Sequence, residues 1–362
     1  MLPHKNAVDT WNVIMSDHLS SLAYLNGKPK AQGKLKMKHE DFCVSENLSF
    51  EPSGHGEHLM LRIRKMGENT SFVANELAKA CGVKSRDVSW AGLKDRHAVT
   101  EQWFSIYLPK SESPDFSLFL TRYPQVEILK TTRHHKKIRP GDLDGNEFKI
   151  VISEVTNVED VLQRLEKVSR GGVPNYFGNQ RFGHGGNNLV EARRWGRENV
   201  RTRNAQKRSL YLSAARSWIF NTIVSARVKK EILNLALLGD IVERNQELVL
   251  VTKENIEIVN HDLVRGFGRV TAAMAGDNSL PTESDALNLE QPFLDAETDL
   301  MSLIRGNRMQ HDRRSCILIP QDMQWSTDKD SVTLQFSLTS GSFATSVVRE
   351  LVNEIEVERT YK

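Results

Sequence analysis

One carboxylate in the sequence stands in a setting that suits catalysis. Asp95 lies between Lys94 and Arg96, after a glycine and just before the β-prone residues Ala-Val-Thr at 98–100. We therefore expect it to project from a turn at the entrance to a strand. Flanking cations lower a carboxylate's pKa and keep it ionised, as a nucleophile or general base requires. A charged surface turn has the same composition, so these residues alone leave both interpretations open.

A second pair of residues could hold a planar ring. Asn146 and Phe148 lie two apart at the start of an alternating segment, so both side chains point to one face of a strand. An amide that reads a base edge beside a ring that stacks on it is a small nucleobase pocket. A turn asparagine beside a core phenylalanine is the alternative.

Other chemistries lack their motifs. His55 and His58 are three apart, and His134 and His135 are adjacent, but neither pair has Cys or Glu partners at zinc-site spacing, so we expect no metal. The G-x-x-x-x-G spacing at 178–183 is followed by His-Gly where a phosphate loop needs Lys and Ser or Thr. No G-x-G-x-x-G follows a strand and no G-x-S-x-G elbow occurs, so we expect no nucleotide cofactor and no hydrolase triad.

Basic residues gather in runs although the formal net charge is only +3. The runs lie at 131–139, 193–208 and 305–314, whereas 283–299 holds six carboxylates and no base. Segregated charge suits a polyanion, because each neutralised phosphate releases counterions. Solvated helix or loop faces are the alternative for each run.

Apolar periodicity predicts the elements that would position these residues. Alternation at 59–63, 104–108 and 148–152 predicts antiparallel strands. Helical spacing predicts helices over 71–81, before Gly82, and over 158–168.

The pattern changes after residue 172. A glycine-, aromatic- and amide-rich segment there leads into helical patterns from about 189 to 238, and the acidic stretch 276–300 is the most loop-like part of the chain. Strand character returns at 332–338, and a final helix carries apolar residues on one face over 347–355. Because strands mark both ends and helices the middle, we infer a segment inserted into an α+β domain built from both termini.

Composition excludes several classes of protein. No window approaches the run of about eighteen apolar residues that a bilayer span needs, and the N-terminus lacks a secretion signal, so we expect neither membrane nor export. Cys43, Cys81 and Cys316 are odd in number and form no C-x-x-C pair, which fits a reducing cytoplasm. Residues 1–14 show no apolar period, and we expect a dispensable, disordered tail.

Six strings, in order along the chain, closely resemble the TruD family of tRNA pseudouridine synthases. They are DFCVSE (41–46), AGLKDRHAVTEQW (91–103), GNEFKI (145–150), GVPNYFGNQRFG (172–183), SLYLSAARS (209–217) and SGSFATSVVREL (340–351). The resemblance implies an enzyme that isomerises a uridine of transfer RNA, at tRNA position 13, to pseudouridine without cofactor or metal. The N-glycosidic bond is broken, the uracil turns over, and it is rejoined to the ribose through carbon 5.

The resemblance also implies a fold and a site. The fold would be α+β: a pseudouridine-synthase catalytic domain with a mixed or antiparallel sheet at 15–171 and 319–362, interrupted by an α/β TruD domain at 172–318. Asp95 would be the indispensable aspartate and Lys36 a basic residue beside it. Whether the carboxylate attacks the sugar carbon or removes a ribose proton to give a glycal stays open. The residues expected to hold the uridine are Phe42, Asn146, Phe148 and Phe343.

Aromatic walls make physical sense because a flipped base loses roughly 1–3 kcal/mol of stacking that the pocket must replace. A cleft between two domains would suit a structured RNA, with basic residues on its walls. The residues expected to contact phosphates are Arg133, Lys136, Lys137, Arg193, Arg194 and Arg197. We expect a cytoplasmic monomer whose partner is tRNA. The alternatives are an RNA-binding or tRNA-folding protein without turnover, and a base-directed methyltransferase, which the missing glycine-rich cofactor loop disfavours.

Overall fold

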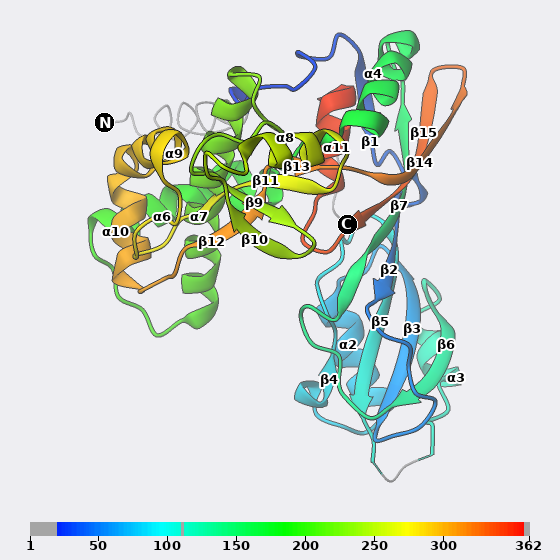
Figure 1. Ribbon diagram of the computed structural model, residues 1–362. Coiled ribbons are helices and arrows are strands. Elements are labelled where there is room, and N and C mark those ends of the chain that lie inside the picture. Colours follow the sequence, from blue (N-terminus) through cyan, green and yellow to red (C-terminus); the bar gives the residue numbers. More distant parts are fainter. Residues whose placement is uncertain (1–19, 110–111, 358–362) are drawn as a thin grey trace, which may run out of the picture. The chain divides into compact units, whose positions relative to one another are not determined.

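The structure is a computed structural model that describes residues 20–109 and 112–357. The tail expected at 1–14 lies outside these residues. The chain forms two compact units (Figure 1). The sheet unit contains the described residues of 29–169, 320–344 and 351–357, and the helical unit contains 20–28, 170–319 and 345–350. The predicted domain boundaries stay a prediction, and residues 345–350 group with the central segment.

A ten-stranded mixed sheet forms the sheet unit, in the order β14-β15-β7-β2-β5-β3-β6 with β1, β16 and β4 beside this path. β2 is parallel to β5 and β1 is parallel to β16, while the other pairs are antiparallel. The mixed α+β fold is therefore confirmed. The strands are β1 (Gln32–Leu35), β2 (Phe42–Leu48), β3 (His58–Met66), β4 (Val88–Ser89), β5 (Val99–Tyr107), β6 (Val126–His134), β7 (Leu143–Ser153), β14 (Gln321–Asp328), β15 (Ser331–Thr339) and β16 (Asn353–Ile355).

Helix α2 (Thr70–Ala80) packs its apolar face on one face of this sheet and closes the core there. Val73, Ala74 and Leu77 pack with the buried residues of β3 and β5, and the helix ends before Gly82, whose φ of +64° suits glycine. The helix expected over 71–81 is confirmed. The other helices that begin in this unit are η1 (His39–Asp41), η2 (Ser85–Asp87), α3 (Ser117–Arg122) and α4 (Val158–Gly171).

The helical unit surrounds the long helix α7, most of whose second half is buried. A four-stranded sheet, in the order β10-β9-β11-β12, accompanies the helices. The helices are α5 (Asn179–Phe182), η3 (His184–Gly186), α6 (Asn187–Arg197), α7 (Ala205–Lys229), α8 (Ile256–Val264), α9 (Ser284–Ala296), α10 (Thr298–Gly306) and, for the most part, α11 (Ala344–Leu351). The strands are β8 (Val173–Pro174), β9 (Ile241–Arg244), β10 (Glu247–Leu250), β11 (Gly268–Met274), β12 (Asp312–Ser315) and β13 (Ile317–Leu318).

Two local predictions are wrong. The acidic stretch 276–300 is not mainly a loop, because α9 and the start of α10 lie in it and bury Ala286, Leu294 and Leu300. The final helix ends at Leu351, and the residues after it extend as β16, which pairs with β1. In both cases a tertiary partner decides the local structure. Among the described residues, no helix is long and apolar enough to span a bilayer.

Candidate functional site

Asp95 lies in the segment 90–98 between β4 and β5, which contains bends but no helix or strand. Side chains from neighbouring elements hold this segment by its backbone. Gln102 Nε2 donates to Gly92 O at 3.2 Å, and the N–H of Lys94 donates to Thr70 Oγ1 at 3.0 Å. The segment is therefore fixed by hydrogen bonds to β5 and α2 rather than by regular structure.

The Asp95 carboxylate is paired with Lys36, which lies just after β1 with a φ of +55°. The other carboxylate oxygen accepts the N–H of His97 at 3.0 Å. Burial by itself would raise the pKa of Asp95, but the charge and hydrogen bond of Lys36, together with the His97 N–H, bring it below its ordinary value. Its side chain keeps 22% exposure, so an ionised carboxylate remains accessible.

Aromatic rings continue from this ion pair across the sheet. Lys36 Nζ lies 4.2 Å from the centre of the Phe42 ring, and that ring meets Phe148 edge-on with centres 6.3 Å apart. Phe148 in turn stacks on Phe336 with centres 5.5 Å apart. The register places Val44 opposite Phe148 and Glu46 opposite Asn146, so all these side chains share one face of the sheet. The structure thus brings Asp95, Lys36 and the two rings of Phe42 and Phe148 together.

Asn146 lies two residues from Phe148 on that face. Its Oδ1 is buried and has no hydrogen-bond partner among the described residues, so this amide carries an unused acceptor. Gly145 precedes it, and a Cβ there would lie 2.2 Å from Leu338 O, so the close approach of β7 to β15 requires glycine. Phe343 is half-buried in the turn after β15, whose Leu338 pairs with Asn146.

Two further charged residues, Glu46 and Lys65, lie at this site and were not among the predicted site residues. Glu46 and Lys94 form a buried ion pair at 2.7 Å, and Glu46 also accepts the N–H of Trp103. Lys65, in β3, is 1% exposed and donates to Asp95 O at 3.4 Å. A signal was available, because Lys65 and Glu46 each occupy the position of an alternating strand that should face inward.

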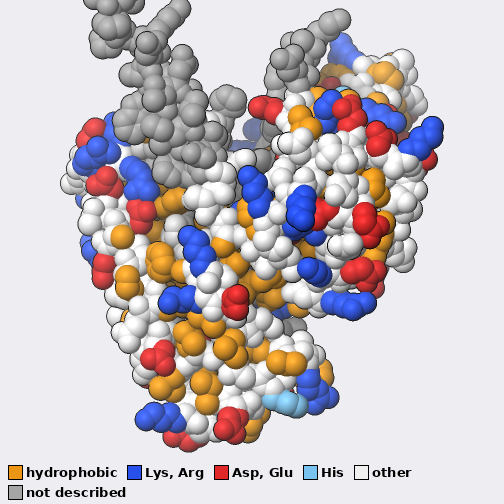
Figure 2. Space-filling view, turned by 90° about the horizontal axis from the view of Figure 1, so that it is seen from above, with side chains coloured by type: hydrophobic (Ala, Val, Ile, Leu, Met, Phe, Trp, Pro, Cys, Tyr) orange, Lys and Arg blue, Asp and Glu red, His pale blue; other side chains and the backbone are white. Residues whose placement is uncertain are grey.

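The predicted phosphate-binding arginines of α6 are paired with carboxylates. Arg193 binds Glu297 through both guanidinium branches, and Arg197 lies 3.5 Å from Asp299. Acids remote in the sequence therefore neutralise this basic run, and Arg194 likewise pairs with neighbouring acids within α6 and just after it. In the face shown in Figure 2, basic and acidic side chains are interspersed.

The other expected phosphate contacts differ in exposure. Arg133 donates to the carbonyls of Gly56 and Leu108, at 3.2 and 2.9 Å. It therefore links β6 to the loop before β3 and to the residue after β5. Lys136 and Lys137 follow β6 and are exposed. These two lysines could bind phosphates without giving up an ion pair that the structure shows. The arginines of α6 would first have to release their carboxylate partners.

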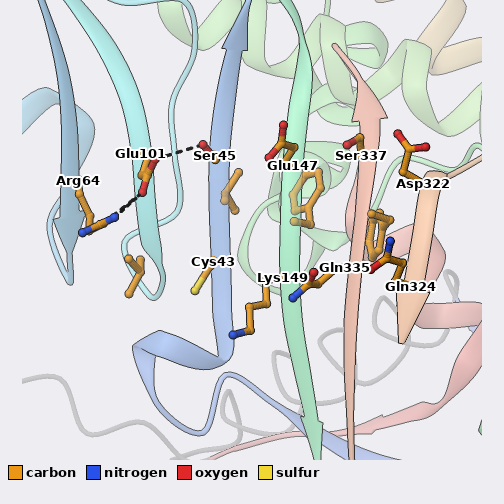
Figure 3. A pocket seen from close by; sticks show the side chains of 14 residues that line it. Cys43, Ser45, Arg64, Glu101, Glu147, Lys149, Asp322, Gln324, Gln335 and Ser337 are labelled. Atoms are coloured by element: carbon orange, nitrogen blue, oxygen red, sulfur yellow. Dashed lines mark hydrogen bonds and ion pairs between the residues drawn. The ribbon is translucent and has the colours of Figure 1, made fainter. Parts of the chain in front are cut away.

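A polar groove of about 520 Å³ lies on the sheet unit (Figure 3). Cys43 and Ser45 line it, and they alternate along β2 with Phe42 and Val44, so the groove lies on the sheet face opposite the Asp95 site. Arg64 and Glu101 form an ion pair at its edge. This groove therefore lies on another face of the sheet than the Asp95 carboxylate, although Val44, Phe148 and Phe336 also border it. Among the described residues no group of three or more His, Cys, Asp or Glu side chains could hold a metal ion.

Known proteins resemble this chain over nearly its whole length. The family model described as tRNA pseudouridine synthase D (TruD) matches residues 18–190 and 187–351. Proteins named tRNA pseudouridine synthase D from Vibrio parahaemolyticus and Vibrio campbellii are 65% and 64% identical over 347 residues, covering 96% of this chain and 100% of each relative. A crystal structure described as that of a TruD protein from Methanosarcina mazei has a TM-score of 0.69 at 23% identity, covers 92% of this chain and 94% of that one, and shows the likeness of fold alone.

Proposed function

The chain belongs to the tRNA pseudouridine synthase D (TruD) family, and we propose that it converts the uridine at position 13 of transfer RNA by means of Asp95. The family assignment makes the chain an isomerase that turns uridine into pseudouridine in tRNA. The position of the uridine and the role of each residue are our proposals. The tRNA is the partner, and we place the reaction in the cytoplasm with a monomeric enzyme.

The observation that carries the proposal is the ion pair of Asp95 with Lys36 beside the Phe42 ring. Isomerisation needs a carboxylate that is ionised at neutral pH, either to add to ribose carbon 1 or to take the proton of carbon 2. The lowered pKa of Asp95 supports both routes. Lys36 would hold the carboxylate in place and keep it charged before the nucleoside enters.

The rings and the amide would hold the extruded nucleoside. Phe42 and Phe148 offer flat apolar surfaces on which uracil can stack, detach and turn while it stays in the site. The unpartnered Oδ1 of Asn146 would accept the N–H of uracil, which fixes the base before and after the turn. Phe343, from the turn after β15, would close the pocket from the side of Asn146.

Phosphate contacts would orient the tRNA without reading its sequence. We propose Lys136 and Lys137 as the first of them, followed by Arg133 and the α6 arginines Arg193, Arg194 and Arg197. The arginines would exchange their present carboxylate partners for phosphates, so their contribution should be smaller. Reversal of the two lysine charges should weaken tRNA binding and reduce its salt dependence.

The decisive experiment uses tRNA labelled with tritium at uracil carbon 5, because that hydrogen is released when carbon 5 joins the ribose. Wild-type protein should release label, and Asp95→Ala should release none while still binding tRNA. Asp115→Ala, at an exposed position of the same unit, is the matched control and should behave as wild type. A transcript with cytidine at position 13 should release no label.

Three results would each overturn a part of the proposal. Binding without release by the wild type would make the chain a passive RNA-binding protein. Release by Asp95→Ala at the wild-type rate would remove Asp95 from the chemistry, and undiminished release from the cytidine-13 transcript would place the reaction at another uridine.

A further inference from the structure

A buried lysine lies directly beneath the loop that carries Asp95. Lys65 occupies an inward-facing position of β3, and its side chain is among the largest that are fully buried. Its Nζ donates to Glu68 O at 2.7 Å and to Asp95 O at 3.4 Å. One ammonium group therefore joins the turn between β3 and α2 to the main chain of Asp95.

This cation has no carboxylate within ion-pair distance among the residues that the structure describes. Its charged neighbours are Asp95 and Lys94 from the loop and Glu68 from the turn. Burial lowers the pKa of Lys65 to about 8, so the charged form is disfavoured there. Burial of an ammonium group that has no carboxylate partner costs stability, and its hydrogen bonds to the carbonyls of Glu68 and Asp95 offset that cost only in part.

The turn between β3 and α2 also holds the loop from a second side. Arg96 Nε donates to Gly67 O at 3.0 Å, one residue before the carbonyl that Lys65 binds. Lys65 and Arg96 thus cross-link the same two segments, one through the main-chain carbonyl of Asp95 and the other through the side chain of the next residue. Without Lys65, the carbonyl of Asp95 loses this donor. The loop is then held through the neighbouring residues Gly92, Lys94 and Arg96.

We propose that Lys65 is a positioning residue for Asp95: its ammonium group fixes the main chain of the catalytic loop so that the carboxylate keeps its direction while the uracil turns. Lys65 would act through Asp95 and would not touch the substrate. The inference rests on the proposed function, since it gives Asp95 the catalytic role. It predicts that Lys65 raises kcat and lowers the free energy of unfolding.

The test compares Lys65→Met with wild type in single-turnover and steady-state release of tritium. Removal of the ammonium group should lower kcat at least about tenfold, because small displacements of a reacting group are costly. KM for tRNA should change less than about threefold, and the melting temperature at pH 7 should not fall. Lys79→Met is the matched control, since Lys79 is an exposed lysine of the same unit, and its kcat should equal that of wild type.

A kcat for Lys65→Met within about twofold of wild type would overturn the inference. If that variant folds poorly, Lys65→Ala assayed with propylammonium decides, with propanol as the neutral control. Restoration of kcat by propylammonium alone supports positioning by the charge, and restoration by neither compound or by both contradicts it. Absence of tritium release by wild type would instead refute the proposed function, so the two failures are distinguishable.

Discussion

Two buried cations, one in each unit, differ in the groups that they bind: one is paired with a carboxylate and the other with backbone carbonyls. Arg227 of α7 is fully buried and forms an ion pair with Asp240, which is also fully buried and accepts the N–H of Leu237 at 2.7 Å. Lys65 of the sheet unit is equally buried but has backbone carbonyls as its partners. A neutralised pair can serve the architecture of its unit, whereas a cation left without a carboxylate requires another reason. The reason that we propose is the positioning of the adjacent Asp95.

The largest effect should follow when the paired cation is removed. Arg227→Met leaves Asp240 buried without its partner, and we expect the free energy of unfolding to fall by about 3–5 kcal/mol. Urea denaturation followed by circular dichroism measures it. The double variant Arg227→Met with Asp240→Leu is the control and should recover most of the loss. A loss below about 1 kcal/mol for the single variant would remove the distinction between the two cations.

The unpaired cation should behave in the opposite way. Because the pKa of Lys65 is lowered to about 8, below the value of the unfolded chain, its burial costs stability at pH 7 and the cost fades as pH rises from about 8 toward 10.5. Lys65→Met should therefore raise the free energy of unfolding by about 1–3 kcal/mol at pH 7, and by clearly less at pH 10. Urea denaturation at both pH values measures the gain. A variant that is less stable at pH 7 would show that the lysine contributes to folding after all.

The smallest effect concerns Lys36, the cation that pairs with Asp95 itself. Its removal leaves mainly the N–H of His97 to oppose the effect of burial, so the pKa of Asp95 should rise. In Lys36→Met, the acid limb of kcat/KM should move up by about 1 pH unit or more, and activity is lost as pH falls through the raised pKa. Wild type should show no limb from Asp95 above its ordinary value of 3.8. Coincident pH profiles would show that another group keeps Asp95 ionised.

Patterns in the sequence predicted those helices and strands whose apolar residues follow a clear period. The alternation around Leu61 and Phe104 predicted β3 and β5, and helical spacing before Gly82 predicted α2. The patterns failed where a partner far along the chain decides the outcome. The composition of the acidic stretch predicts a loop. In the folded chain, Glu290 forms an ion pair with Arg313 and Glu297 with Arg193, and the stretch is largely helical. The short strands β9 to β12 went unpredicted, since four to seven residues carry little periodicity and pairing supplies the rest.

The site divides in the same way. The types and spacing of its residues indicated Asp95, Asn146 and Phe148 as candidates, because flanking charges and the two-residue period of a strand act over short distances. No local pattern indicated Lys36, which only the family resemblance placed beside Asp95, and Lys65 was not among the predicted site residues. Both contacts depend on tertiary structure: the register of β3 beside β5 and the course of the chain after β1.

The sequence by itself determined the class of fold and the family and indicated candidate residues for the chemistry, since motifs and periodicity are local. Only the tertiary structure decided which charges meet. The effect of a charge depends on its surroundings, and burial together with the distance to the nearest opposite charge exists only once the chain has folded.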